Sequence, residues 1–223
     1  MGRTVCAAVA ADPDLVFAAA VDPNGAGETV EGVAVSEHLH AFADAACDVV
    51  VDFTVADAAR NTLPWLGMHG IHAVVGTTGF TDADFELFES TFASASGPNC
   101  VIAPNFAISA VLMMRFAEMA APFFDTAEII ELHHDRKIDA PSGTALMLGE
   151  AVAAGRGVDL HTHSARGRDG ITGARRPGDI GFASLRGGTV TGDHSVIFAG
   201  AMERITLSHH AEDRMMFAQG AIK

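Results

Sequence analysis

Two histidines, a lysine and a Ser-Gly-Thr turn lie close together in residues 133–145, HHDRKIDAPSGTA. This stretch follows the apolar run AEIIEL, which predicts a strand over 127–132. An imidazole, and a lysine whose pKa is lowered by its neighbours, can both move protons near neutral pH. The spacing therefore indicates proton-transfer chemistry at the end of a strand.

Lys137 is one of only two lysines in a chain with 12 arginines, and the other is the terminal Lys223. Arginine cannot release its proton near neutral pH, whereas lysine can, so Lys137 is a candidate acid. The alternative is a GC-rich genome that favours arginine and left one internal lysine by chance. Because neighbouring side chains of a strand point to opposite faces, we expect different roles for His133 and His134.

A helix is predicted from Pro141-Ser142 to about Gly155, with Ser142, Gly143 and Thr144 at its start. The free amides and hydroxyls of such a start suit a carboxylate, although Ser142 could serve only as a helix cap. A metal site is a further alternative, built from His133, His134, Asp135, Asp139, His209 and His210. We expect no metal, because the spacing matches no HExxH or HxH pattern and the cation of Lys137 would weaken metal binding.

Strands and helices alternate over the first 106 residues. The predicted elements are a helix end at 5–11, strands at 15–21, 47–54, 71–80 and within 99–109, and helices at 55–69 and 82–94. Thr81 with Asp84 resembles a capping box that opens the last of these helices. We expect an α/β domain with a Rossmann-like parallel sheet, in which the strand at 47–54 is buried on both faces.

The pattern changes after Phe124. Short alternating runs at 180–188, 189–200 and 202–210 predict further strands, and 159–179 is a polar loop rich in Gly and Arg. We therefore expect a second, α+β domain with a mixed or antiparallel sheet over 107–213, while 214–223 returns to the first domain.

Small and amide-bearing residues follow three predicted strands of the first domain, where a parallel sheet binds its ligands. They are Phe53-Thr54, Gly76-Thr77-Thr78-Gly79 and Ala103-Pro104-Asn105-Phe106. Asp22 follows another strand, at the position of an acid that binds ribose hydroxyls. Together they favour a nucleotide site, although Gly-Thr-Thr-Gly could be an ordinary turn.

No GxGxxG motif occurs, and Gly25-Ala26-Gly27 lacks the third glycine. The chain also starts with a helical pattern where a βαβ unit should start with a strand. We therefore expect a truncated first domain whose first strand is missing, with Met1-Gly2-Arg3 as the remainder of a glycine-rich loop.

Composition excludes several classes of protein. With 49% hydrophobic and 19% charged residues the chain should fold around a core, and its net charge of −14 argues against a nucleic-acid surface. No apolar run approaches the ~20 residues of a membrane span. Cys6, Cys47 and Cys100 show no metal-ligand spacing, so we expect reduced thiols and a cytoplasmic protein.

The run ELHHDRKIDAPSGTAL resembles the signature of the 4-hydroxy-tetrahydrodipicolinate (dihydrodipicolinate) reductase family. The resemblance extends to VVDFT, GIHAVVGTTGF, IAPNFAIS and GDHSVIFAG, and so covers essentially the whole chain. It implies reduction of 4-hydroxy-tetrahydrodipicolinate with NADH or NADPH and loss of water, in lysine and diaminopimelate biosynthesis. It also implies a dinucleotide-binding domain, a domain for substrate and oligomerisation, and a cytoplasmic homotetramer with no nucleic-acid or membrane partner.

The resemblance also implies roles for individual residues. His133 and Lys137 would donate protons, and a substrate carboxylate would be held by His134, Ser142, Gly143 and Thr144. The cofactor would be held by Met1, Asp22, Gly76, Thr77, Thr78, Ala103, Pro104, Asn105 and Phe106. Pro23 stands where some members carry an arginine for a 2′-phosphate, which favours NADH. A truncated, non-catalytic fragment of such an enzyme and a metal-dependent hydrolase remain the alternatives.

Overall fold

The computed structural model describes all 223 residues, which form two compact units. Unit 1 comprises Met1–Phe106 and Arg214–Lys223, and unit 2 comprises Ala107–Asp213. No helix is long and apolar enough to cross a membrane.

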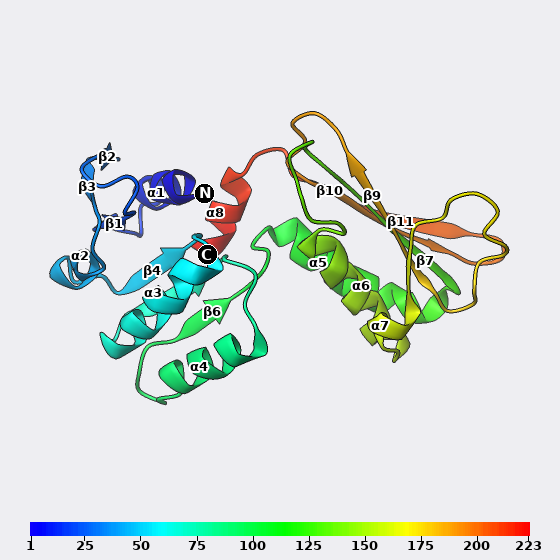
Figure 1. Cartoon of the computed structure of the whole chain (residues 1–223), viewed down its shortest axis with the longest axis horizontal. Coiled ribbons are helices and arrows are strands. Elements are labelled where there is room, and N and C mark those ends of the chain that lie inside the picture. The colour runs from blue at the N-terminus through cyan, green and yellow to red at the C-terminus, as the bar shows by residue number, and fades with distance from the viewer. The chain divides into compact units, whose positions relative to one another are not determined.

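Unit 1 contains two separate three-stranded sheets (Figure 1). Its elements are α1 (Gly2–Ala11), β1 (Ala20–Val21), β2 (Thr29–Val30), β3 (Val33–Ser36), α2 (His40–Asp44), β4 (Val49–Asp52), α3 (Ala56–Met68), β5 (His72–Val75), α4 (Asp82–Phe92), β6 (Cys100–Ile102) and α8 (Met215–Ala221). The sheet β4-β5-β6 is entirely parallel. In the sheet β1-β3-β2, β1 is parallel to β3 and β2 is antiparallel to it. The α/β class with a parallel sheet is confirmed.

The predicted capping box is present at the start of α4. The Thr81 hydroxyl accepts a hydrogen bond from the Asp84 amide at 3.3 Å, and the Asp84 carboxylate accepts one from the Thr81 amide at 2.7 Å. Arg60 of α3 also binds this carboxylate, and its hydrogen bonds hold the pKa of Asp84 well below its usual value. The Arg60–Asp84 ion pair thus holds the start of α4 against α3.

Two expectations for unit 1 are wrong in detail. The strand predicted at 47–54 is buried on both faces only in part. Val50 joins the core with α3, Val51 packs on the other face against the cluster of α1 and α8, and Val49 is 50% exposed. β4 is an edge strand of its sheet. The strand predicted at 15–21 is reduced to the two residues of β1, because β3 pairs only with Ala20 and Val21.

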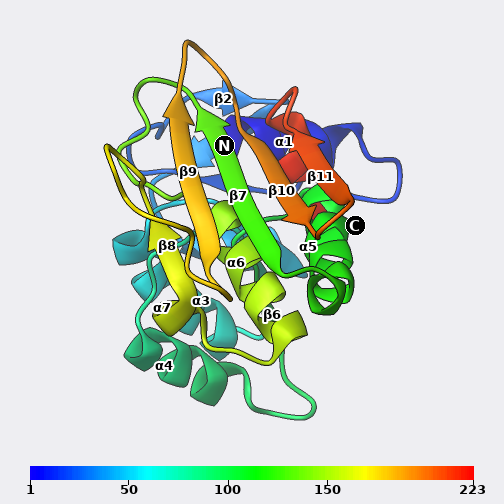
Figure 2. The same cartoon turned by 90° about the vertical axis from the view of Figure 1, so that its right-hand side faces the viewer.

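Unit 2 is a five-stranded mixed sheet with helices packed on one face (Figure 2). Its elements are α5 (Ile108–Ala120), the 3-10 helix η1 (Ala121–Phe123), β7 (Thr126–His133), α6 (Gly143–Arg156), α7 (Leu160–His163), β8 (Ser164–Arg166), β9 (Ile180–Arg186), β10 (Asp193–Ala199) and β11 (Arg204–His210). The strand order is β11-β10-β7-β9-β8. β9 is parallel to both β7 and β8, and β10 is antiparallel to both β7 and β11. The mixed sheet is confirmed.

Strict alternation along β7 positions the residues of the signature. Ala127, Ile129, Glu131 and His133 are buried, and the residues between them lie on the other face. The apolar members of the buried set join a core with α5, α6, β9 and β10. α5 and α6 pack so closely that a Cβ at Gly155 would lie 2.2 Å from the carbonyl oxygen of Glu118. The helix-facing side of β7 therefore carries apolar residues at its start and two ionisable side chains at its end.

Candidate active site

His133 is the last residue of β7, and its side chain is almost enclosed. The residue is 8% exposed, and its Nδ1 lies 2.5 Å from Oε2 of Glu131. Burial lowers the pKa of His133, and the nearby cations of Lys137 and Arg186 act in the same direction, while Glu131 opposes them. The pKa is lowered on balance, so His133 is neutral at pH 7.

Glu131 lies two residues earlier on the same face of β7 and is 1% exposed. Its carboxylate binds Nη1 of Arg186 at 2.9 and 3.1 Å and accepts a hydrogen bond from the Ser142 amide at 3.3 Å. Burial raises the pKa of Glu131, but hydrogen bonds from Ser184, His133 and Arg186 outweigh burial and lower it overall. Glu131 is therefore an ionised carboxylate inside unit 2.

Lys137 is held in the loop after β7. Its Nζ lies 2.8 and 2.9 Å from the carboxylate oxygens of Asp139, and its backbone amide donates to the carbonyl oxygen of His134. Arg186 donates from Nη2 to the carbonyl oxygen of Asp139 at 2.6 Å. One guanidinium thus binds both the carboxylate beside His133 and the loop that holds Lys137.

Ser142 is the N-cap of α6, one of the two roles considered for it. Its hydroxyl accepts a hydrogen bond from the Ala145 amide at 3.1 Å and also lies 2.9 Å from Nε2 of His194. Gly143, the first residue of α6, is exposed. The helix start is therefore fixed by a buried cap while its first residue faces solvent.

A row of three buried histidines crosses the sheet. The ring centroid of His194 lies 5.1 Å from that of His133 and 6.1 Å from that of His209. Burial, with smaller contributions from the two neighbouring histidines, lowers the pKa of His194 to about 4. His194 is therefore a neutral core residue that contacts both His133 and the cap of α6.

The structure brings together His133, Lys137 and Ser142 through residues that sequence reasoning missed, namely Glu131, Arg186 and His194. His134 lies beyond the end of β7, partly buried, and its Nδ1 is buried without a hydrogen-bond partner. Residue alternation could have revealed Glu131, which lies two positions from His133. Arg186 and His194 become neighbours only through the register of β9 and β10.

The strand ends of unit 1 also pack together. Asp52, at the end of β4, is buried and accepts hydrogen bonds from the hydroxyls of Thr54 and Thr77, both at 2.8 Å. A Cβ at Gly76 would lie 2.2 Å from the ring of Phe53, whose centroid lies 5.8 Å from that of Phe106. The candidate cofactor residues after β4, β5 and β6 therefore form one cluster.

The remaining cofactor candidates occupy different surroundings. Thr78 and Pro104 are exposed, Ala103 is partly buried, and Asn105 is buried. Asp22 is exposed after β1, where its side chain accepts a hydrogen bond from the Asn24 amide at 2.9 Å. Met1 is the residue before α1. Asp22 and Met1 thus belong to segments outside the sheet β4-β5-β6.

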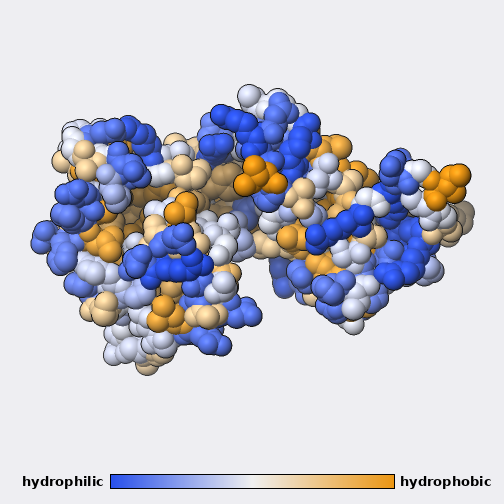
Figure 3. Space-filling view, viewed as in Figure 1, coloured by the Kyte–Doolittle hydropathy of each residue, from blue (hydrophilic) through white to orange (hydrophobic).

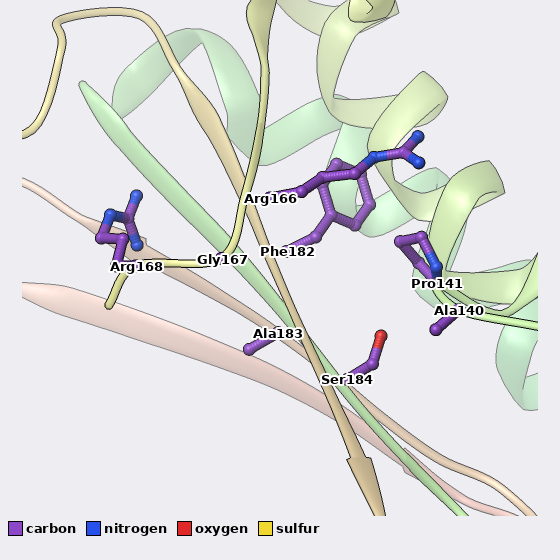
Figure 4. Close-up of a pocket in the computed structure, with 8 residues that line it drawn as sticks. All are labelled: Ala140, Pro141, Arg166, Gly167, Arg168, Phe182, Ala183 and Ser184. Atoms are coloured by element: carbon purple, nitrogen blue, oxygen red, sulfur yellow. The ribbon is translucent and has the colours of Figure 1, made fainter. Parts of the chain in front are cut away.

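Unit 2 also has a pocket of about 490 Å³ that contains none of the predicted site residues (Figure 4). It is lined by Ala140, Pro141, Arg166, Gly167, Arg168, Phe182, Ala183 and Ser184. No group of three or more His, Cys, Asp or Glu side chains is arranged to hold a metal ion.

Comparison with known proteins gives matches over the whole chain. The family model "Dihydrodipicolinate reductase, N-terminus" matches residues 1–106, and "Dihydrodipicolinate reductase, C-terminus" matches residues 109–223. Proteins named 4-hydroxy-tetrahydrodipicolinate reductase are similar to all of this chain, which spans 86% of their length. They include those of Rhodopseudomonas palustris strain TIE-1, at 48% identity, and Bradyrhizobium diazoefficiens, at 46%.

Two solved structures have similar folds. The dipicolinate-bound dihydrodipicolinate reductase of Paenisporosarcina sp. TG-14 matches 99% of this chain and 87% of its own, with a TM-score of 0.79 and 30% identity. GenD2 from gentamicin A biosynthesis, in complex with NAD, matches 93% of this chain and 69% of its own, with a TM-score of 0.59. At 16% identity, the second likeness concerns the fold alone.

Proposed function

The chain belongs to the dihydrodipicolinate reductase family, and we propose that it reduces 4-hydroxy-tetrahydrodipicolinate to tetrahydrodipicolinate with NAD(P)H and releases water. The observation that carries this proposal is the cluster at the end of β7, where a neutral His133 and the Lys137–Asp139 ion pair lie beside the start of α6. Matches over all of this chain, and over 86% of proteins named 4-hydroxy-tetrahydrodipicolinate reductase, favour this function over a non-catalytic fragment and over a metal-dependent hydrolase.

We assign the binding of a substrate carboxylate to the start of α6. Amides in the first turn of a helix and the positive end of its dipole stabilise an anion. Gly143 is exposed there, and Thr144 follows it. The dihydrodipicolinate reductase of Paenisporosarcina sp. TG-14 was solved with dipicolinate bound, and this cyclic dicarboxylate supports a substrate of the same class. His134 is the further carboxylate ligand in this proposal, because its buried Nδ1 lacks a partner in the chain.

The two proton-transfer roles follow from the states of the side chains. Loss of the hydroxyl as water requires a proton on its oxygen, and the cationic Nζ of Lys137 is the donor. The ring carbon between the imine carbon and the hydroxyl-bearing carbon loses a proton in this elimination. Because His133 is neutral, it accepts that proton at Nε2 and returns it to the same carbon after reduction. Lys137 then regains one proton from solvent, which matches the proton consumed overall.

The nicotinamide cofactor supplies the hydride when bound. The residues after β4, β5 and β6 would hold it: the buried Asp52–Thr77 hydrogen bond joins the loops after β4 and β5, and the absence of a Cβ at Gly76 lets the ring of Phe53 pack against this loop. We propose that Gly76–Thr78 and Ala103–Phe106 hold it, with Asp22 at its ribose and Met1 as a further contact. NADH is preferred in this proposal, because an exposed carboxylate followed by Pro23 offers no cation to a 2′-phosphate.

The two units receive separate roles in this proposal. Unit 1, with Arg214–Lys223, binds the dinucleotide, and unit 2 binds the substrate and assembles the oligomer. The sheet face opposite the helices carries Ile130, Leu132, Leu185 and Ile197, and Leu185 is 51% exposed. Figure 3 shows hydrophobic residues at the surface of unit 2 as separate patches among hydrophilic ones. We propose that this face joins copies of the chain into a homotetramer. Three free cysteines support a cytoplasmic location.

The test is substrate-dependent oxidation of NADH and of NADPH by the purified chain, followed by absorbance. We expect turnover with both cofactors and a higher kcat/KM with NADH, and light scattering should give four times the 23.2 kDa chain mass. A fluorescence titration with NADH separates the alternatives. Saturable binding without turnover would contradict the catalytic assignment, and no binding at all would favour a non-functional fragment.

A further inference from the structure

Glu131 has no part in the mechanism above, although it is the most buried ionisable side chain near His133. Placing a carboxylate inside a protein costs several kcal/mol unless charged and hydrogen-bonding partners compensate it. Glu131 has such partners on every side: Arg186, His133, the Ser142 amide and the Ser184 hydroxyl. A carboxylate with this many partners is a fixed point around which other groups are oriented.

The register of β7 with β9 builds this arrangement. Glu131 lies opposite Ser184, and His133 lies opposite Arg186 on the adjacent parallel strand. Arg186 therefore reaches the Glu131 carboxylate from one side while His133 reaches it from the other. Oε2 lies 2.5 Å from Nδ1 of His133, and Oε1 accepts from the Ser142 amide at 3.3 Å. One carboxylate thus contacts both the histidine ring and the cap of α6.

We propose that Glu131, held by Arg186, is the positioning residue of this site: it keeps a proton on Nδ1 of His133, so that Nε2 is the proton acceptor, and it aligns the start of α6. An ionised carboxylate can only accept a hydrogen bond, so the proton of this contact belongs to Nδ1. A neutral imidazole has one protonated nitrogen, so Nε2 carries the lone pair. The inference rests on the proposed reductase function only for what Nε2 then does.

The surroundings of Nε2 agree with this role. A Cβ at Gly192 would lie 3.0 Å from Nε2 of His133. Because position 192 is a glycine, no side chain crowds the ring nitrogen that is assigned to accept the proton. When that proton arrives, the ionised Glu131 stabilises the resulting imidazolium at a distance of one hydrogen bond.

Burial, assisted by the cations of Lys137 and Arg186, keeps His133 neutral before that step. The ionisable groups that face His133 are Glu131 of β7, Lys137 of the following loop, Arg186 of β9 and His194 of β10. Glu131 alone would raise the pKa of His133, whereas the cations of Lys137 and Arg186 lower it. Removal of the Glu131 charge should therefore lower the pKa of His133 further, and this shift is measurable.

The kinetic experiment compares Glu131→Gln with the matched variant Glu128→Gln. Glu128 lies on the same strand but on the other face, where its carboxylate binds Arg168 and Arg175. Both variants remove a charge and leave arginines unpaired, but only one contacts His133. We expect Glu131→Gln to lower kcat by about 10²-fold, within the range for a misplaced general base. Loss of the carboxylate also removes an influence that raises the pKa of His133, so the acidic limb of kcat/KM should move to lower pH.

We expect Glu128→Gln to keep kcat within about twofold of the unaltered chain, with the acidic limb of kcat/KM at the same pH. Because Glu128 lies on the sheet face that we assign to oligomerisation, light scattering should give the same mass for both variants. Equal losses in the two variants at equal losses of stability would overturn the proposal. The proposal would also be overturned if the acidic limb of kcat/KM in Glu131→Gln lay at the same pH as in the unaltered chain. Glu131→Asp, which keeps the charge but shortens the side chain, should keep the limb nearer to its original pH while kcat falls.

A second measurement needs neither a variant that folds nor enzymatic activity. In the ¹⁵N-histidine NMR spectrum of the unaltered chain at pH 7, we expect His133 to be neutral with the proton on Nδ1. A proton on Nε2 would refute the positioning role. If the chain shows no reductase activity but Nδ1 is protonated, the proposed function fails and the positioning contact stands.

Discussion

Replacement of Ser142 by alanine tests whether the cap of α6 and the buried histidines form one unit. The hydroxyl accepts from the Ala145 amide and also contacts Nε2 of His194, and both contacts are buried. Loss of an N-cap costs about 1 kcal/mol. Loss of the only partner of a buried ring nitrogen costs about 1–3 kcal/mol more. We therefore expect Ser142→Ala to destabilise α6 and its surroundings by about 2–4 kcal/mol.

The assay must report on unit 2. The only tryptophan, Trp65, lies in α3 of unit 1, so intrinsic fluorescence would follow the wrong unit. Amide hydrogen exchange in α6, measured by mass spectrometry, is specific to the affected helix. A loss of about 2–4 kcal/mol should lower protection of the buried amides near Leu148 and Val152 by about 30- to 10³-fold.

Ser142→Gly serves as the control, because glycine at an N-cap costs only a few tenths of a kcal/mol relative to serine. The glycine variant should therefore retain the larger part of the loss, which comes from His194. If Ser142→Gly leaves protection unchanged while Ser142→Ala lowers it about tenfold, the histidine contact contributes nothing and the reasoning is wrong.

Three further outcomes are expected. Lys137→Ala should lower turnover by about 10²–10⁴-fold, since it removes the assigned acid, and turnover equal to that of the unaltered chain would exclude Lys137 from the mechanism. Gly192→Ala should lower kcat, because its Cβ would lie 3.0 Å from Nε2 of His133, while the circular dichroism spectrum stays unchanged; full activity would show that this space is not needed. Burial lowers the pKa of His194 from 6.5 to about 4, so its contribution to stability is complete above pH 6.5 and is lost as the pH falls towards 4. Urea titrations followed by circular dichroism should therefore lose roughly 3 kcal/mol more over this range in the unaltered chain than in His194→Asn, and parallel losses would contradict a neutral buried His194.

Strong local patterns in the sequence predicted their helices and strands well. The capping box at Thr81 and the alternation along 126–133 depend on residues within one or two turns or along one strand, and both are present as expected. The strand at 47–54 packs against apolar clusters on both faces, at Val50 and at Val51, but the apolar run did not show that Val49 at its start is half-exposed.

The residues of the site also differ in how well the sequence predicted them. His133, Lys137 and Ser142 could be found because they lie within ten residues of one another. Arg186 and His194 could not, because they reach the site from strands whose register depends on the whole sheet. Glu131 lies two positions before His133 on the same strand, so alternation could have placed it on the face of His133, but the sequence does not show its pairing with Arg186.

The strand order of unit 2 also determines when the site can exist during synthesis. β7 lies between β10 and β9, and both of these strands are made after it. During synthesis, β7 and the loop with Lys137 are therefore made before either neighbouring strand. Arg186, whose guanidinium binds both Glu131 and this loop, follows about fifty residues later. A chain whose synthesis ends before β9 therefore carries the complete signature but lacks Arg186, the residue that binds Glu131.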